Sequence, residues 1–449
     1  MKDQYRNLFK SLIESYYNGN FEDEVKFILS QSKINKKELC KIISSLCGTS
    51  TDCSSNFTED LKKAIKSYKP DGKIVNKVKF CTMECMDKTG KTLCQKSCPF
   101  DAILMDAAQN SIHIDKHKCT DCGFCVEACP TGGIMDKVQF LPLANILKGN
   151  SPVIAIVAPA IIGQFGKDVT LGKLRSAFKK LGFTDMIEVA FFADMLTLKE
   201  AIEFDNHIKD EKDFMITSCC CPMWVGMLKK IYNNLIKYVS PSVSPMAAGG
   251  RVLKKLNPNC KVVFIGPCIA KKSEAKEKDI IKNIDFVLTF SEVKDIFDTL
   301  NIHPNELKEE PSTEYASSGG RLYARTGGVS IAVSEAVKRI FPEKYKLFKA
   351  VKANGVKECK SILSRAQNGE IEANFIEGMG CIGGCVGGPK AIIPKEEGKK
   401  CVDKFADDSE IKVSIDSDCM NEILDKIGIH SIEDFKDKNK IKLLERFFN

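Results

Sequence analysis

Three short cysteine runs hold the residues most able to do chemistry. They read T-S-C-C-C-P-M-W over residues 217–224, G-P-C-I-A-K-K-S-E over 266–274 and E-G-M-G-C-I-G-G-C-V-G-G over 377–388. Thiolates on short loops, without the spacing of a tetrahedral zinc site, indicate iron–sulfur chemistry. The third run's paired glycines let the backbone approach a bulky cluster closely. Four thiolates from these loops could hold one cubane: Cys221, Cys268, Cys381 and Cys385. The alternative is three unrelated cysteine loops.

Eight further cysteines lie upstream, in the spacing of a two-cluster bacterial ferredoxin. The second half is C-x2-C-x2-C-x3-C-P from Cys119, and the first half is a looser C-x3-C-x8-C-x3-C-P from Cys81. In this pattern the last cysteine of each half binds the other half's cluster. The expected ligand sets are therefore Cys81, Cys85, Cys94 and Cys129 for one 4Fe-4S cluster, and Cys98, Cys119, Cys122 and Cys125 for the other. A zinc knuckle is the alternative, but it uses one pair of short spacings.

Three more cysteines, Cys40, Cys47 and Cys53, lie near the N-terminus. Residues 1–80 contain no histidine that could complete a set of four ligands. We therefore expect thiols packed in or beside helices rather than a third accessory cluster.

Composition limits the class of protein. A chain of 449 residues with 43% hydrophobic content is long enough for two to four globular domains. No apolar run reaches membrane-spanning length, and the N-terminus has no signal-peptide core. The prediction is a cytoplasmic protein with reduced or metal-bound cysteines, not disulfides. The formal charge of +8 is no argument for nucleic acid, because anionic clusters would offset it.

Three regions can be distinguished along the chain. Residues 1–75 read as a helical N-terminal region, 76–145 as an α+β ferredoxin-like domain, and 146–449 as an α/β catalytic domain with a charged tail. The apolar runs 153–158 and 261–266 are typical of buried parallel strands. Amphipathic helices are expected between such strands, and Cys268 just past one of them fits a ligand at a strand's carboxyl end. These helices are expected over 171–181, 195–208, 331–340 and 420–426.

Taken together, the three runs resemble the catalytic signatures of the iron-only (FeFe) hydrogenases, and the resemblance covers residues 80–390. It implies two lobes with mostly parallel sheets. It also implies an H-cluster, in which a cubane is linked through a cysteine to a di-iron subsite carrying CO, cyanide and a bridging dithiolate. Cys221, Cys268, Cys381 and Cys385 match the cubane ligands, and Cys385 matches the one that also bridges to the subsite.

The same resemblance assigns roles to further residues. Lys271 matches the lysine that contacts a cyanide, Met379 the methionine beside the subsite, and Cys220 the thiol that passes protons. Glu200, Glu203 and Ser240 match the rest of the proton path, and His207 stands where the family has an arginine. From the residues alone, structural roles are the alternative to proton transfer: Thr197 to Glu200 could be a helix capping box, and Glu203 a solvated helix residue.

The first signature departs from the family pattern, because it has three cysteines where the family's best-known members have two. Pro222 restricts the backbone of the residue before it, so we align the run on Pro222 and Trp224. This register makes Cys221 the cubane ligand, Cys220 the proton-transferring thiol and Cys219 the inserted residue. Ala160, Gly266 and Pro389 also differ from the residues usual near the cofactor, which indicates a divergent branch.

The predicted activity is the reversible reaction 2H⁺ + 2e⁻ ⇌ H₂, with electrons exchanged through the two 4Fe-4S clusters with ferredoxin or a similar carrier. Dedicated maturation proteins are further expected partners, and nucleic acid and membrane are not. Two other functions stay open: a hydrogen sensor, and a non-enzymatic iron–sulfur assembly factor. Cys220, Lys271 and Met379 together favour the enzyme.

Overall fold

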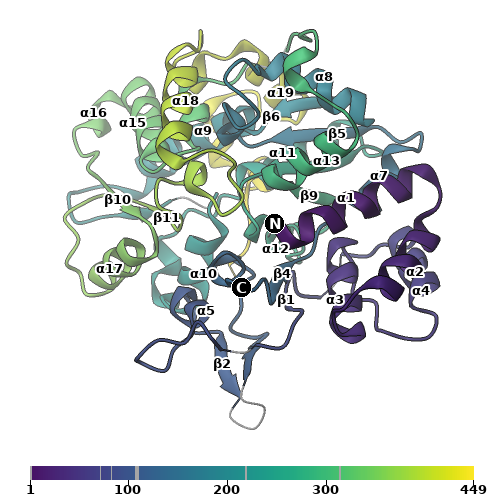
Figure 1. Ribbon diagram of the computed structural model, residues 1–449. Helices are drawn as coiled ribbons and strands as arrows, with labels where there is room; N and C mark the ends of the chain where they lie inside the picture. The colour runs from purple at the N-terminus through teal and green to yellow at the C-terminus, as the bar shows by residue number, and fades with distance from the viewer. Residues whose placement is uncertain are drawn as a thin grey trace.

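The computed structural model describes residues 3–70, 72–81, 83–106, 111–217, 220–312 and 315–448 (Figure 1). Within these residues no helix is both long and apolar enough to cross a membrane. The N-terminal helices lie to one side of the catalytic domain, and strand β2 (Ile103–Asp106) of the ferredoxin-like region extends below it in the view of Figure 1.

Four helices form the N-terminal region, as the sequence predicts. They are α1 (Asp3–Asn18), α2 (Phe21–Gln31), α3 (Lys36–Leu46) and α4 (Phe57–Lys66). Asn35 caps α3 by accepting a hydrogen bond from the backbone N–H of Lys37 at 2.9 Å. Apolar side chains from all four helices are buried in the main core of the protein, which also takes in the four-stranded sheet of the catalytic domain.

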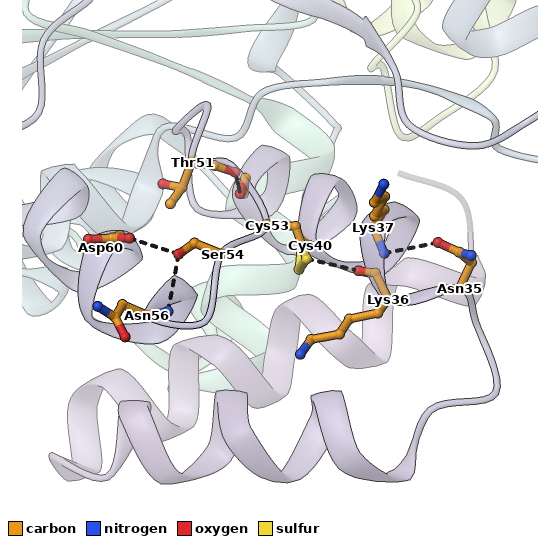
Figure 2. Close-up of a disulfide and its surroundings, with 10 residues drawn as sticks. Asn35, Lys36, Lys37, Cys40, Thr51, Cys53, Ser54, Asn56 and Asp60 are labelled. Atoms are coloured by element: carbon orange, nitrogen blue, oxygen red, sulfur yellow. Dashed lines mark hydrogen bonds between the residues drawn. A yellow bond between two sulfur atoms is a disulfide. The ribbon is translucent and has the colours of Figure 1, made fainter.

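One expectation about this region is wrong. Cys40 and Cys53 form a disulfide that ties α3 to the loop before α4, whereas the sequence analysis expects reduced thiols (Figure 2). Cys47 is a buried free thiol, as expected. The loop 47–56 doubles back along α3 and brings Cys53 beside Cys40, a proximity that spacing alone does not show.

The ferredoxin-like region is built from two short antiparallel strand pairs and two short helices. The strands are β1 (Val75–Lys77), paired with β4 (Ile134–Asp136), and β2 (Ile103–Asp106), paired with β3 (Ser111–Ile114). The helices α5 (Leu93–Ser97) and α6 (Phe124–Ala128) each precede the last cysteine of one half. The sequence repeat is thus also a structural repeat.

The catalytic domain has two parallel sheets, as expected for two lobes. One has the order β6-β5-β8-β9 and the other β10-β11-β7. The strands of the first are β5 (Val153–Val157), β6 (Asp185–Glu188), β8 (Lys261–Gly266) and β9 (Phe286–Thr289). Those of the second are β7 (Met215–Ile216), β10 (Ala350–Asn354) and β11 (Phe375–Met379).

Helices connect and cover these strands. They are α7 (Phe140–Leu147), α8 (Leu171–Leu181), α9 (Val189–His207), α10 (Pro222–Lys230), α11 (Pro245–Leu256), α12 (Ala270–Glu274), α13 (Phe290–Thr299), α14 (Ser318–Leu322), α15 (Gly328–Ile340), α16 (Pro342–Tyr345), α17 (Val356–Gln367), α18 (Lys395–Asp407) and α19 (Asp418–Lys426). Short 3-10 turns include η4 (Cys385–Gly387), η6 (Ile432–Lys436) and η7 (Ile441–Leu444).

Helix α9 lies at the centre of the catalytic domain and is buried from Val189 to Phe204. It begins six residues before the predicted start at Met195, because residues 189–193 are all apolar and Asp194 is buried as well, which masks the amphipathic period. Thr197 is therefore not a helix cap: its hydroxyl donates to the Ala193 carbonyl oxygen within the helix at 2.9 Å. The capping-box interpretation of Thr197 and Glu200 is wrong.

Candidate H-cluster site

The four candidate cubane ligands lie on loops at the carboxyl ends of parallel strands. Cys221 follows β7 and immediately precedes Pro222, the first residue of α10. Cys268 follows β8, while Cys381 and Cys385 follow β11. Strands of both sheets thus end beside the four thiols, and the carboxyl ends of strands are where a parallel α/β fold is expected to bind ligands.

These four thiols are close enough to affect one another's ionisation. Burial raises the pKa of Cys385 to about 12, and the neighbouring thiols of Cys221 and Cys268 add to this. Burial likewise raises the pKa of Cys268 to about 11. Thiols with a raised pKa seldom ionise by themselves, but binding to cationic iron stabilises their thiolate form.

The glycines of the third run shape the cradle for a bulky group. A Cβ on Gly387 would lie 2.0 Å from the Ile382 carbonyl oxygen, and one on Gly384 would lie 2.6 Å from the Thr326 nitrogen. Gly384 also has a φ of +86°, which other residues rarely adopt. The donor set and this tight loop fit a cubane. Among the described residues no three Cys, His, Asp or Glu side chains converge as ligands of one metal ion, and a cubane instead binds its thiolates at separate irons.

An almost entirely apolar cavity adjoins these ligands. Three polar side chains, those of Cys220, Lys271 and Tyr323, line it together with Cys385 and apolar residues such as Phe264. Lys271 is buried and donates to Glu274 at 2.6 Å. Burial alone would lower the pKa of Lys271, but the Glu274 carboxylate outweighs it, so the ammonium stays charged. A diatomic anion in this cavity would meet one fixed cation.

Cys220 and Cys221 lie in different surroundings. Cys221 accepts from the Gly380 backbone N–H at 3.4 Å, beside the third run, whereas Cys220 faces the cavity. Cys219 lies outside the described residues. Met379 is buried in an apolar cluster that includes Cys220 and Cys221, rather than on the cavity lining.

Glu200 and Glu203 of α9 are buried carboxyl groups that accept hydrogen bonds from hydroxyl groups. Burial raises the pKa of Glu200 to about 7, although a hydrogen bond from the Thr217 hydroxyl opposes the shift. Ser240 donates to Glu203 Oε2 at 2.6 Å. Ser240 and the exposed His207 both line a surface cavity of about 310 Å³. Glu203 is thus one hydrogen bond away from a residue that lines a surface cavity.

Several of these residues are missed by sequence reasoning. Thr217 belongs to the first signature and could have been named, while Tyr323 lies in no cysteine run. Lys199 is buried and pairs with Glu203, four residues later on the same helix. That spacing is a recognisable helix pair, but the sequence does not reveal that it is buried.

The ferredoxin-like cysteines form the two expected groups. Cys81, Cys85, Cys94 and Cys129 line one cavity, and Cys98, Cys119, Cys122 and Cys125 line another. Each group mixes the two halves of the repeat, as the crossing pattern requires. The second group lies next to the catalytic domain: a Cβ on Gly123 would lie 2.5 Å from Ile269 Cδ1, beside Cys268.

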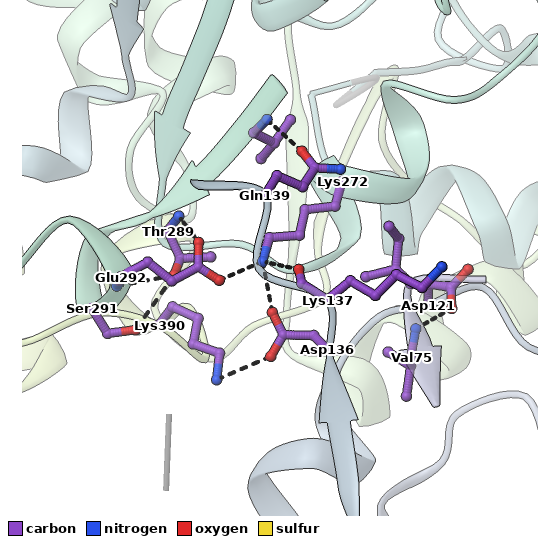
Figure 3. A network of polar contacts seen from close by, with 12 residues as sticks. Val75, Asp121, Asp136, Lys137, Gln139, Lys272, Thr289, Ser291, Glu292 and Lys390 are labelled. Atoms are coloured by element: carbon purple, nitrogen blue, oxygen red, sulfur yellow. Dashed lines mark hydrogen bonds and ion pairs between the residues drawn. The ribbon is translucent and has the colours of Figure 1, made fainter. Parts of the chain in front are cut away.

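A buried ionic network joins this region to the catalytic loops (Figure 3). Lys272 Nζ donates to Asp136 Oδ2 at 2.8 Å, to the Lys137 carbonyl oxygen at 2.7 Å and to Glu292. Lys390, which follows the third run, pairs with Glu127 at 2.9 Å and with Asp136 at 3.5 Å. The loops of two cubane ligands are thereby tied to β4 and α6 of the ferredoxin-like region.

Comparison with known proteins gives the class. Residues 151–389 match the model of the iron only hydrogenase large subunit, C-terminal domain, and residues 111–134 match a 4Fe-4S binding domain. The chain therefore belongs to the iron-only hydrogenase large-subunit family. Its two cysteine-rich regions are accordingly iron–sulfur regions of a hydrogenase-like protein.

Individual relatives include both enzymes and an assembly protein. Iron hydrogenase 1 of Clostridium pasteurianum is 28% identical over 65% of this chain and 67% of its own length. Cytosolic iron-sulfur assembly component 3 of Mus musculus is 24% identical over 65% of this chain and 75% of its own. A variant of the FeFe-hydrogenase HydA1 from Chlamydomonas reinhardtii has the same fold: TM-score 0.56, 21% identity, with 69% of this chain and 98% of that chain covered.

Proposed function

We propose that the protein is an FeFe hydrogenase that catalyses 2H⁺ + 2e⁻ ⇌ H₂. The observation that carries the proposal is the cavity in which Cys220 and Lys271 face the same space as Cys385. A scaffold that only held a cubane would have no use for a buried thiol and a buried ammonium beside it. An H-cluster bound there would supply the iron chemistry that forms and splits H₂.

The side chains of the chain have distinct roles in this proposal. Cys221, Cys268, Cys381 and Cys385 hold the cubane, Lys271 fixes an anionic ligand by charge, and Met379 packs beside the site. Cys220 holds the proton at its sulfur, next to the reacting centre. Glu200, with a pKa near the working pH, suits a group that both takes and gives a proton.

Electrons would enter through the two 4Fe-4S clusters. The close approach of Gly123 to Ile269 makes the Cys98, Cys119, Cys122 and Cys125 cluster the inner one, and the other set the outer one. We propose ferredoxin or a similar small carrier as the electron partner and hydrogenase maturation proteins as assembly partners, in an anaerobic cytoplasm. Nucleic acid and membrane have no part in the proposal.

Metal content and infrared spectroscopy test the function. Three cubanes and a di-iron subsite predict about 14 irons per chain after reconstitution and maturation. Matured protein should also show CO and cyanide bands where polypeptide does not absorb, and evolve H₂ from reduced ferredoxin. A reproducible value near eight irons without those bands would refute the H-cluster.

A separate experiment tests whether the two 4Fe-4S clusters only transfer electrons and the H-cluster site carries out the reaction. Cys122→Ala should slow electron exchange with ferredoxin but leave the CO and cyanide bands in place. Disappearance of the bands would mean that Cys122 belongs to the catalytic site.

The second candidate is an iron–sulfur assembly factor, favoured by the similarity to the mouse assembly component. It predicts cubanes without a di-iron subsite and without H₂ turnover under the same maturation. The infrared bands decide between the two functions.

A further inference from the structure

The last described residues of the chain reach the proposed proton path. Residues 441–446, here called the C-terminal strap, lie outside the matched hydrogenase domain. The backbone N–H of Val243 donates to the Leu444 carbonyl oxygen at 2.9 Å, and that of Arg446 donates to the Pro241 carbonyl oxygen at 2.7 Å. The strap therefore runs antiparallel to the segment that follows Ser240.

Side chains hold the strap in this place. Arg251 of α11 donates to the backbone carbonyl oxygens of Leu443, at 3.1 Å, and of Glu445. The Arg446 side chain is 1% exposed and pairs with Glu277. A segment anchored at several points can present one side chain in a fixed direction.

The side chain so presented is Glu445, and it faces Lys199. Glu445 Oε1 lies 3.5 Å from Lys199 Nζ, and its side chain remains 23% exposed. Lys199 has no exposed surface and also contacts Glu203 and, at 3.3 Å, the Ser242 hydroxyl. The Ser242 and Ser240 hydroxyl oxygens are 2.8 Å apart. One buried ammonium thus bridges a carboxylate of the proton path and a carboxylate that reaches solvent.

We propose that Glu445 is a proton inlet of this enzyme and that Lys199 connects it to Glu203. The idea rests on the proposed function. When Glu445 has taken a proton from a hydronium ion of the solvent, which leaves water, one N–H bond of the Lys199 ammonium breaks as its proton moves to a Glu203 oxygen. The nitrogen's freed electron pair then takes the proton of the Glu445 carboxyl. The net result is one proton moved from Glu445 to Glu203, with Lys199 again an ammonium.

The charges around Lys199 decide its protonation between transfers. Burial alone would lower the pKa of Lys199, but Glu203, Glu445 and, more weakly, Glu200 outweigh it and raise the pKa. The ammonium form is therefore the resting form before and after each transfer. His207 and the cavity that it shares with Ser240 form the competing inlet.

Matched variants of matured holoenzyme separate the two inlets. Glu445→Gln keeps the shape of the side chain but cannot carry a proton, so H₂ evolution should fall about three- to ten-fold, with a larger solvent deuterium isotope effect and a shifted pH profile. Glu445→Asp should recover part of the rate. Glu433→Gln, on the same tail but 75% exposed and paired with Lys436, should change none of these. Unchanged rate and pH profile in Glu445→Gln, with loss in His207→Ala, would overturn the proposal.

A second measurement does not depend on turnover. In protein that has its cubanes but not the di-iron subsite, pH-difference infrared spectra record the carboxyl bands, and Glu203→Gln identifies the band of Glu203. Glu445→Gln and Lys199→Gln should both shift the titration midpoint of that band, and Glu433→Gln should not. An unmoved midpoint in both variants would refute the coupling, even if the enzyme makes H₂. Failure to make H₂ after maturation, with the midpoint shifted, would instead refute the proposed function.

Discussion

Lys199 and Lys272 are both fully buried lysines that pair with two carboxylates, but their surroundings differ. Lys272 has three good acceptors for its three protons: Asp136, Glu292 and the Lys137 carbonyl oxygen. Lys199 has one close carboxylate, and its contacts to Ser242 and Glu445 are longer, at 3.3 and 3.5 Å. One network is saturated and enclosed, and the other has hydroxyl groups and a route to solvent.

The difference separates a structural ion network from one that can move protons. Burial alone would raise the pKa of Asp136, but the ammonium groups of Lys272 and Lys390 hold it well below its usual range. Asp136 therefore stays ionised and fixes the junction between the electron and catalytic regions. On the proton side, the raised pKa of Glu200 leaves that group able to change protonation near neutral pH.

The largest effect on stability is expected at Lys272. Lys272→Met would leave Glu292 buried without its cation and Asp136 with only Lys390, at 3.5 Å, which should cost about 3–5 kcal/mol of unfolding free energy. Denaturant unfolding of the reconstituted protein would measure it.

Lys294→Met is the matched control. Lys294 lies on α13, is 52% exposed and pairs with Asp298 at the surface, so its loss should cost less than about 1 kcal/mol. Similar costs for both variants would mean that the Lys272 network is not enclosed, and the contrast with Lys199 would fail.

The next effect is a pH dependence that arises from Glu200. Since burial raises its folded pKa to about 7 from an ordinary value of 4.5, the native state holds a proton between these pH values that the unfolded state has lost. Stability should fall as pH rises through this window, by roughly 3 kcal/mol in total. Glu200→Gln should make the fall in unfolding free energy between pH 5 and pH 8 smaller by this amount, while buried Asp194, whose pKa burial also raises to about 7, keeps a fall of its own.

Asp136 gives the opposite response. A carboxyl with a depressed folded pKa stabilises the protein above its unfolded pKa, and this stabilisation is lost only as pH falls through the folded value. Asp136 should therefore contribute equally at pH 5 and pH 8. If Glu200→Gln retains the full fall between these pH values, another group is responsible for it.

The smallest effect on stability is expected at Ser240. Ser240→Ala removes the hydrogen bond to Glu203, but Lys199 still pairs with that carboxylate. The unfolding free energy should therefore fall by only about 1.5 kcal/mol, while H₂ evolution falls at least ten-fold. Ser44→Ala removes a partly buried hydrogen bond to the Thr51 carbonyl oxygen, at 3.0 Å, in the N-terminal region. It should cost about 1 kcal/mol with turnover unchanged. Equal turnover in the two variants would remove Ser240 from the path.

Local patterns predicted the parts of the molecule that depend on neighbours in sequence. The apolar runs at β5 and β8 and the period of α8 gave strands and a helix where the structure has them. Cysteine spacing gave the two groups of four in the ferredoxin-like region. These features depend on residues that are close together in the sequence, so a single sequence is enough to predict them.

The missed features depend on contacts between distant segments. Glu445 comes to Lys199 from a tail without a motif, and Tyr323 reaches the cavity from α14's end. Cys40 meets Cys53 because of the path of a loop. The start of α9 was missed for another reason, since a helix buried on all faces has no amphipathic period.

The four candidate cubane thiols come from two different sheets. Cys268 follows a strand of the four-stranded sheet, while Cys221, Cys381 and Cys385 follow strands of the three-stranded sheet. A cluster bound by all four would act as a covalent cross-link between segments far apart in the sequence, and would reduce the conformational entropy of the unfolded chain. Loading of the cubane would then be a late folding event that joins the two halves of the domain, and hydrogen exchange at their contact would report whether a molecule has received it.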